Sequence, residues 1–235
     1  MNKYHVGVLE EIKINKGTAN YGQSTMGTTK LCYQVTVPCR RKIAVNFIKK
    51  YPQLVSKELI TLLDYLFMGK SHEEITLGGL LLEYLPKLKR ELNPQSLDKW
   101  LEHTEGWAEV DTLCQSNWKA EILLSNWPAW EKLLNKFVID RNIHKRRASL
   151  VILNKAIRQS DDTRLSEMVF KNIELLKHEK NILITKAISW LLRSLIDKHR
   201  LVLEKYLLKN EVSLPKIAVR EVKNKLKTGK KSGLR

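Results

Sequence analysis

Apolar side chains recur at the period of an α-helix along nearly the whole chain from residue 38 onward. They return at i, i+3, i+4 and i+7 over stretches of about 12 to 18 residues, which is the pattern of helices with one buried face. The pattern predicts helices over 38–51, 55–68, 72–91, 95–103, 106–124, 127–138, 143–158, 162–177, 180–197, 199–209 and 214–227. Such a chain is expected to adopt an all-α fold.

Short breaks separate the predicted helices. Candidate N-caps are Ser56, Asp140, Asp161 and Ser213. Connections of a few residues make consecutive helices antiparallel neighbours, and helix pairs in series are typical of an α-solenoid of the HEAT or armadillo kind. We therefore expect a single HEAT-like α-solenoid domain over residues 1–228. A compact helical bundle is the alternative, because the internal sequence repeat is weak.

Two segments depart from the helical pattern. Residues 15–37 are polar and rich in Gly, Ser and Thr, which predicts an irregular loop that is either functional or a flexible connection. Residues 229–235 form a basic tail that is expected to be disordered. Within the predicted helix 72–91, the pair Gly78-Gly79 indicates close packing of two helices.

The charge is strongly positive: 42 Lys and Arg oppose 25 Asp and Glu, for a net charge of +17. This excess favours a polyanionic partner, either nucleic acid or an acidic membrane surface. The alternative is a lysine-rich surface with no role in nucleic-acid binding. From His199 to the end of the chain, eleven Lys and Arg face only three acids, so about +8 of the excess lies there.

Several function classes are disfavoured. Three cysteines (Cys32, Cys39 and Cys114), with no CxxC pair, argue against a disulfide framework and against a zinc site. The chain has no phosphate-binding glycine loop and no nucleophile elbow, and we expect no cofactor. No apolar run approaches the ~18 residues of a membrane helix. The N-terminus does not resemble a signal peptide, so we expect a cytoplasmic protein.

Trp107 and Asp111 are four residues apart in GWAEVDTLC, which places them on one face of a helix. Arg147 lies beside the buried stripe of HKRRASLVIL, where a charge needs a partner such as Asp111 or a phosphate. Arg146 points further out. The alternative interpretation is a core indole, a solvated acid and an arginine that reaches to solvent.

Trp190, Arg193 and Asp197 share one face of the segment KAISWLLRSLID. Arg193 is expected to pair with Asp197, and Trp190 alone would be read as a core residue. Taken together with Trp107 and Asp111, the indoles and charged groups suggest one concave site that faces nucleic acid.

These segments, with TVPCRRKIA, HEEITLGGLLLEYL and LPKIAVREVKNKL, occur in an order that resembles the DNA alkylation repair family of HEAT-like DNA glycosylases. The resemblance covers most of the chain from about residue 35. It implies a curved stack of helical pairs with a concave basic face that binds duplex DNA. It also implies excision of positively charged alkylpurines, of the N3-methyladenine and N7-methylguanine type, without flipping the base out of the stack. A monomer is expected.

By position, the residues that match the cleft residues of the family are Trp107, Asp111, Arg147, Trp190 and Arg193. The catalytic group is Trp107, Asp111, Arg147 and Trp190. The residues expected to bind DNA are Arg40, Arg41, Lys145, Arg146, Lys186 and Arg193. An aromatic residue from the N-terminal loop, Tyr21 or Tyr33, is expected to line the cleft.

The chemistry agrees with this assignment. A cationic alkylpurine is already a good leaving group, so the reaction needs no general acid. Asp111 would stabilise an oxocarbenium-like sugar and position a water, while Trp107 and Trp190 would offer π faces to the cationic base. Arg147 would bind the flanking phosphate and keep Asp111 ionised. The alternatives are a catalytically silent HEAT-like protein that binds nucleic acid, and a HEAT-type scaffold for protein interactions.

Overall fold

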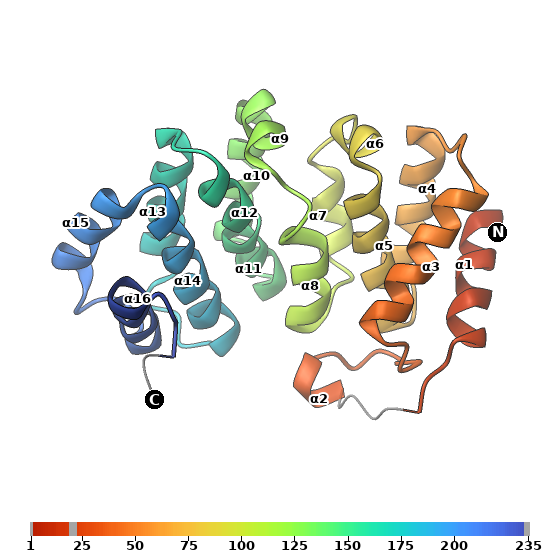
Figure 1. Cartoon of the computed structure of the whole chain (residues 1–235), viewed down its shortest axis with the longest axis horizontal. Coiled ribbons are helices and arrows are strands. Elements are labelled where there is room, and N and C mark those ends of the chain that lie inside the picture. Colours follow the sequence, from red (N-terminus) through yellow and green to blue (C-terminus); the bar gives the residue numbers. More distant parts are fainter. Residues whose placement is uncertain (1, 19–22, 233–235) are drawn as a thin grey trace. The chain divides into compact units, whose positions relative to one another are not determined.

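The computed structural model describes residues 2–18 and 23–232, and within these ranges the chain is built of helices (Figure 1). The one β-type pairing among the described residues is an isolated parallel bridge between Leu31 and Ser71. The all-α prediction is therefore confirmed. The chain divides into two compact units, Met1–Asn117 and Trp118–Arg235, which are described separately.

The first unit holds the helices up to α8. Their bounds are α1 Lys3–Ile14, α2 Gln23–Met26, α3 Val37–Lys50, α4 Ser56–Phe67, α5 His72–Tyr84, α6 Pro86–Arg90, α7 Ser96–Leu101 and α8 Gly106–Cys114. Helices α1 and α3 contact each other and both contact α5, which in turn contacts α4 and α8. Helices close in sequence are thus stacked side by side, which is the local arrangement of an α-solenoid.

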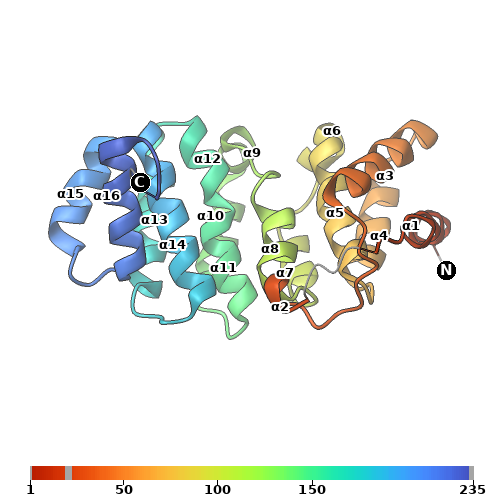
Figure 2. The same ribbon diagram turned by 60° about the horizontal axis from the view of Figure 1, so that its bottom comes forward.

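The second unit begins with α9. Its helices are α9 Ala120–Ser125, α10 Trp127–Val138, α11 Ile143–Val151, α12 Leu153–Gln159, α13 Thr163–Leu176, α14 Ile182–Ser194, the 3-10 turn η1 Leu195–Asp197, α15 Arg200–Asn210 and α16 Lys216–Thr228. Helix α14 is central, since it contacts α11, α12, α13 and α16. Figure 2 shows α13, α14 and α16 side by side within this unit.

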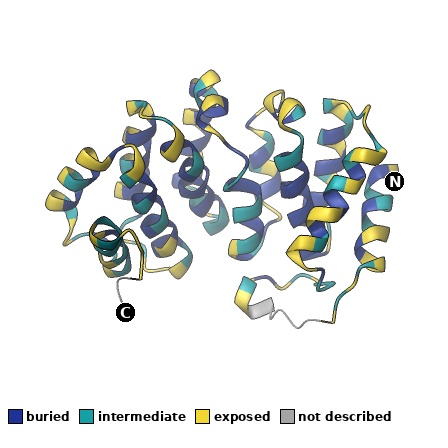
Figure 3. Cartoon of the chain, viewed as in Figure 1, coloured by how far each residue is buried: buried dark blue, intermediate teal, exposed yellow. Residues whose placement is uncertain are grey.

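Each unit has its own apolar core, and the helices turn their buried faces inward (Figure 3). In the first unit a cluster of buried residues joins α1, α3, α4 and α5 through Tyr4, Ile12, Phe47, Leu62 and Leu77. In the second unit, the indoles of Trp118 and Trp130 lie against each other, with 4.9 Å between ring centroids. Trp118 is thus a core residue.

The predicted glycine contact is confirmed. A Cβ on Gly79 would lie 2.7 Å from the Thr112 carbonyl oxygen, and one on Gly78 would lie 3.0 Å from the Phe67 ring. A side chain at Gly79 would therefore force α5 away from α8. The closeness of these two helices fixes α8, which carries Trp107 and Asp111.

Three predicted helices are each broken in two. The helix predicted over 143–158 is interrupted at Ile152, between α11 and α12. The helix predicted over 72–91 is interrupted at Leu85, because the following Pro86 disfavours the α conformation there. The helix predicted over 106–124 stops at Cys114. The Asn117 side chain ends α8 by donating hydrogen bonds to its last carbonyls, including that of Leu113 at 2.9 Å.

Several helix starts differ by one or two residues from the predictions. The four predicted N-caps are wrong, since the N-cap positions are held by Val55, Asn142, Asp162 and Pro215. Asn142 and Asp162 accept hydrogen bonds from the backbone of the first helical turn, as a good cap should. At Asn142 and Asp162 the error arises because neighbouring residues are equally good caps in isolation.

Residues 15–37 contain the short helix α2 and an extended segment that is packed against the first unit. We call residues 25–35 the docked loop. Its Leu31 carbonyl accepts a hydrogen bond from the His72 backbone N–H at 2.9 Å. Helix α2 contacts α8, and Figure 2 shows it at one end of that helix. Outside α2, the described part of this segment is irregular, and it is built into the fold.

The basic tail starts beyond α16. Gly229 ends this helix in the left-handed conformation, with φ of 74°, a common way for a helix to terminate. Residues 229–232 belong to the described part of the chain, and the Lys231 carbonyl accepts a hydrogen bond from the Asn224 amide at 3.2 Å. The rest of the tail, 233–235, lies outside the described residues.

Candidate functional site

Helix α8 displays two kinds of residue on opposite sides. At 100° per residue, Trp107 and Asp111 lie about 40° apart, whereas Glu109 points to the other side. The structure agrees: Trp107 is 42% exposed, Asp111 is half-buried and Glu109 is fully buried. The alternative interpretation of Trp107 as a core indole is therefore wrong.

The Trp107 side chain is held by the docked loop. Its indole nitrogen donates a hydrogen bond of 2.8 Å to the carbonyl of Thr25. The N–H group is thus satisfied by the protein, while a large part of the ring is exposed. An exposed indole whose N–H is already bonded offers mainly its π face to a ligand.

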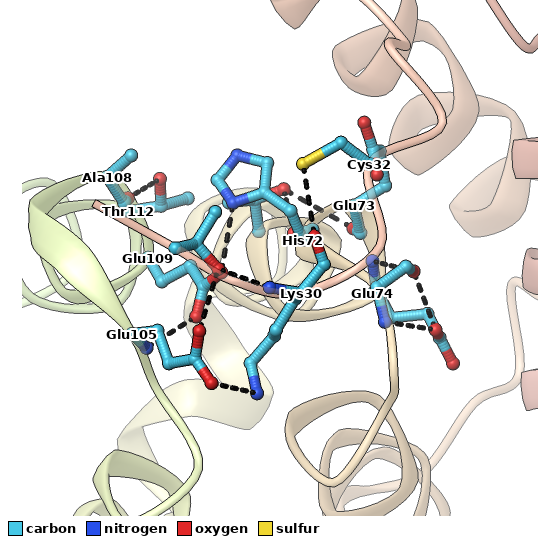
Figure 4. A network of polar contacts seen from close by, with 12 residues as sticks. Lys30, Cys32, His72, Glu73, Glu74, Glu105, Ala108, Glu109 and Thr112 are labelled. Carbon is cyan, nitrogen blue, oxygen red and sulfur yellow. Dashed lines mark hydrogen bonds and ion pairs between the residues drawn. The ribbon is translucent and has the colours of Figure 1, made fainter. Parts of the chain in front are cut away.

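Glu105 and Glu109, at the start of α8, bind the docked loop (Figure 4). Glu105 accepts hydrogen bonds from the backbone N–H of Thr29 at 2.6 Å and from its hydroxyl at 2.9 Å. The Thr28 hydroxyl donates to Glu109 at 3.1 Å. Lys30 lies 3.5 Å from the second carboxylate oxygen of Glu105. Two acids therefore anchor three consecutive loop residues.

The carboxylate of Glu105 is held in its charged form. Burial raises its pKa, but the hydrogen bonds from Thr29 and the nearby charge of Lys30 outweigh this effect. The net pKa of Glu105 lies below its usual value. The anchor of the loop is therefore anionic at neutral pH.

A buried chain of polar contacts connects Glu109 to α3. Nδ1 of His72 lies 3.0 Å from Glu109, and Nε2 lies 3.4 Å from a guanidinium nitrogen of Arg40. Because a guanidinium only donates, Nε2 accepts and Nδ1 carries the hydrogen that is donated to Glu109. Arg40 also donates to the Thr76 hydroxyl.

This chain of contacts includes Arg40, which was expected to bind DNA. Arg40 is 9% exposed and its guanidinium contacts α5. It therefore holds α3 against α5, and its role in binding DNA stays a prediction. Its neighbour Arg41 is exposed and keeps the predicted role.

The N-terminal aromatic expected in the cleft has two candidates. Tyr33 is half-buried and packs against the apolar core of the first unit. Its backbone N–H donates to Glu73 at 2.9 Å, so Tyr33 helps to anchor the far end of the docked loop. Tyr21 lies outside the described residues.

In the second unit, Arg147 is buried, with 5% of its surface exposed. Its guanidinium donates a hydrogen bond to the backbone carbonyl of Leu183, in the first turn of α14. The arginine therefore has a partner in its own unit and does not simply reach to solvent. Its contact links α11 to the helix that carries Trp190 and Arg193.

The two basic residues before Arg147 bind protein groups. Lys145 is buried and lies 3.8 Å from Asp140. Arg146 forms a two-pronged contact with Glu179, at 2.7 and 3.1 Å, and also donates to the Asp140 carbonyl. Such bidentate pairs fix geometry. Both residues brace the start of α11 in this structure, and their role in binding DNA stays a prediction.

Helix α14 presents Lys186, Trp190 and Arg193. Lys186 is exposed, whereas Trp190 and Arg193 are half-buried. Arg193 lies 3.4 Å from Glu221 on α16, and burial lowers its pKa although Glu221 opposes this. The predicted pairing with Asp197 is wrong.

The partner of Asp197, which lies in η1, is on α16. Its carboxylate lies 4.0 Å from Lys225. Lys225 and Glu221 both belong to α16, which packs against α14. The packing of α16 against α14 therefore replaces the predicted Arg193–Asp197 pair with two other pairs, Arg193–Glu221 and Lys225–Asp197.

Sequence reasoning missed Glu105, Glu109, His72 and Thr28. The sequence feature that could have indicated this network is Glu109. Its charge interrupts the apolar face of a predicted helix, as the charge of Arg147 does in another helix. A buried acid needs donors, but nothing local identifies them, because Thr28 is 81 residues away.

No group of His, Cys, Asp and Glu in the described parts of the chain has a metal-binding arrangement. The three cysteines are free thiols. Among the helices that the structure describes, none combines the length and apolarity needed to cross a membrane.

Comparison with known proteins gives one informative match. A search of curated proteins finds nothing similar to this chain. A family model described as DNA alkylation repair enzyme matches residues 9–226, which spans both units and includes all the residues of α8, α11 and α14 discussed above. The chain therefore belongs to the DNA alkylation repair enzyme family.

Proposed function

We propose that this protein is a DNA glycosylase that hydrolyses the N-glycosidic bond of positively charged alkylpurines in duplex DNA. The proposed lesions are of the N3-methyladenine and N7-methylguanine type. The membership in a family of DNA alkylation repair enzymes supports repair of alkylated DNA. The step from repair to base excision rests on the residues of α8.

The observation that carries the proposal is the pairing of Trp107 and Asp111 on α8. The indole is 42% exposed although its N–H is bonded inside the protein, and a half-buried carboxylate follows one turn later. A π face and a carboxylate both attract a cation. This pair suits a substrate whose base and whose sugar, in the transition state, both carry positive charge.

Asp111 would then act on the sugar. The alkylated base departs as a neutral molecule, so its departure needs no proton from the enzyme. The carboxylate would stabilise the developing oxocarbenium charge and accept a proton from the attacking water. Such a reaction does not require the base to leave the stack, and we propose that the lesion stays stacked.

The residues of the second unit would contact DNA through charge and stacking. We propose that Arg193 and Arg147 bind phosphates and that Trp190 contacts the lesion or its sugar. The contact of Arg147 with Leu183 would keep its guanidinium in a fixed position. Fixed donors stabilise charge better than mobile ones, because they need no reorganisation.

Exposed cations would supply the remaining phosphate contacts. Helix α16 presents four of them at i, i+4, i+7 and i+11, so they form one stripe. These residues are Lys216, Arg220, Lys223 and Lys227, all exposed. The opposite side of α16 carries the buried Ala218 and Val222. With Arg41 and Lys186, this stripe would add to the contacts expected from Arg40, Lys145 and Arg146.

The proposal is tested by incubating the protein with methylated duplex DNA and measuring free N7-methylguanine. Asp111→Asn should lower the rate of release by about 10²- to 10³-fold and leave DNA binding intact. Asp161→Asn is the matched control, because it removes the same charge from an exposed position. Fluorescence of 2-aminopurine beside the lesion should stay quenched if the base is not flipped.

Two other results would contradict the proposal. DNA binding without base release, in the wild type and Asp111→Asn alike, would establish a catalytically silent binding protein. Absence of DNA binding even at low salt, where several phosphate contacts are easily detected, would establish a scaffold for protein interactions.

A further inference from the structure

The docked loop connects the exposed face of α8 to its buried face. At one end, the Thr25 carbonyl accepts the Trp107 hydrogen bond. Three residues later, Thr28 donates to the buried Glu109. We propose that Glu105 and Glu109 are positioning residues, which hold the docked loop so that Thr25 keeps the Trp107 indole beside Asp111. The inference rests on the proposed function, but its structural half can be tested without DNA.

Glu105 fixes the main chain of the loop. Its carboxylate accepts the Thr29 backbone N–H at 2.6 Å as well as the Thr29 hydroxyl at 2.9 Å. A bond to a backbone N–H restrains the chain itself and not only a side chain. Hydrogen bonds to a charged group are also stronger than those between neutral groups.

Glu109 fixes the loop to the interior. It is fully buried, it accepts the backbone N–H of Glu105 at 2.7 Å, and its other oxygen contacts Thr28 and His72. A buried carboxylate is expensive to leave without donors. The loop therefore stays in place because its departure would deprive Glu109 of the Thr28 hydroxyl.

Two glycines allow the docked loop to approach α8 closely beside Thr25. Gly27 and Gly106 both have positive φ, of 73° and 66°. A Cβ on Gly106 would lie only 2.0 Å from the Met26 carbonyl oxygen, so the loop and the start of α8 touch through their backbones. Thr25 lies one residue before this contact, which leaves its carbonyl little freedom to move away from α8.

An exposed indole needs such a restraint. Without the bond to Thr25, the Trp107 ring would lose the contact that selects one of its rotamers. A ring that is free to rotate would still contact DNA, but it would spend less time in the reactive position. Release of the docked loop should therefore lower kcat more than it raises KM.

The test uses protein labelled with ¹⁵N in its tryptophans, so that each indole N–H gives one signal. The Trp107 signal is identified by its loss in Trp107→Phe. The variants Thr28→Val, Glu105→Gln and Glu109→Gln each weaken one anchor. Each should shift the Trp107 signal and speed its exchange with solvent by about tenfold or more, with the other indole signals in place.

Base release is measured on the same variants. We expect kcat to fall about 10- to 100-fold with little change in KM. Glu58→Gln is the matched control, because this carboxylate also accepts a hydroxyl and a backbone N–H in the first unit, from Tyr4 and Val55. It should change neither kcat nor the Trp107 signal.

An unchanged Trp107 signal in folded Thr28→Val and Glu105→Gln would overturn the inference, as would a released indole with an unchanged kcat. These two variants decide the matter even if Glu109→Gln fails to fold. If the wild type releases no base from methylated DNA, the proposed function fails. The indole exchange then decides the anchoring alone.

Discussion

Glu221 on α16 forms an ion pair with Arg193 on α14, with 3.4 Å between Glu221 Oε2 and Arg193 Nη2. Glu221 also accepts a hydrogen bond of 2.6 Å from the Ser189 hydroxyl. The carboxylate therefore competes with any phosphate for Arg193. In the proposed complex, Arg193 would either leave Glu221 and bind a DNA phosphate, or contact both groups at once.

Removing the charge of Glu221 should strengthen DNA binding. Glu221→Gln keeps an oxygen that can accept from Ser189 but leaves Arg193 without its counter-charge. We expect the affinity for duplex DNA to rise about two- to fivefold, the size typical of a partly exposed ion pair. Glu204→Gln, which loses a pair with Arg200 on α15, is the control for net charge. Equal effects of both variants would show that the Arg193 pair is irrelevant to binding.

The cation stripe of α16 should be visible in the salt dependence of binding. The double variant Arg220→Gln, Lys227→Gln should reduce the slope of log K against log salt by about 1.8, since each phosphate contact contributes about 0.9. Lys205→Gln, Lys209→Gln removes two exposed cations from α15, where exposed Leu201 and Leu208 interrupt the charge, and should leave the slope unchanged. A fluorescence titration at several salt concentrations measures both. Equal slopes for the two double variants would argue against the stripe.

The contact between α5 and α8 should tolerate no side chain at Gly79. Gly79→Ala places a Cβ 2.7 Å from the Thr112 carbonyl, and we expect the free energy of unfolding to fall by about 1–3 kcal/mol. Gly7→Ala is the control. A Cβ at Gly7, on α1, meets nothing within 4 Å, so this change should stabilise by about 0.5–1 kcal/mol. Urea denaturation measures both values, and a neutral Gly79→Ala would show that the helices can separate freely.

The anchoring of the docked loop should depend on pH below 5. The pKa of Glu105 is lower in the folded protein than its usual value, which is about 4.3 in an unfolded chain. Its contribution to stability is thus complete above that value and is lost as the pH falls through the lowered one. The Trp107 indole shift, followed from pH 6 to pH 3, should change in this window before the helical circular dichroism does. Glu105→Gln should lack this step, and a wild-type profile identical to that of the variant would count against it.

The sequence predicted helix positions well because their cause is local. A buried face repeats every 3.6 residues, and most helices begin and end within two residues of the predicted bounds. Three predicted helices are split, at Leu85, at Ile152 and before Asn117, and α1 lies before the first predicted helix. A proline effect such as that at Leu85 is readable in advance, whereas the contact from Asn117 to the Gly79 carbonyl depends on tertiary packing.

Which of two adjacent arginines is buried was not predictable. Arg40 and Arg41 are 100° apart on a helix, and only the position of α5 decides that Arg40 contacts Thr76. Arg146 similarly finds Glu179, 33 residues away. The pairing of Trp107 with Asp111 on one helix face was predictable, because it needs only the helical period. The partner of Trp107 in the docked loop was not.

The distance along the chain between Thr25 and Trp107 also has a kinetic consequence. These residues are 82 positions apart, so their hydrogen bond closes a very long loop, and contacts of this kind form late in folding. Helices α5 and α8 must pack before Glu105 and Glu109 can receive residues 25–35. The Trp107 ring should therefore become ordered in the last folding step of the first unit, after the core of that unit has formed.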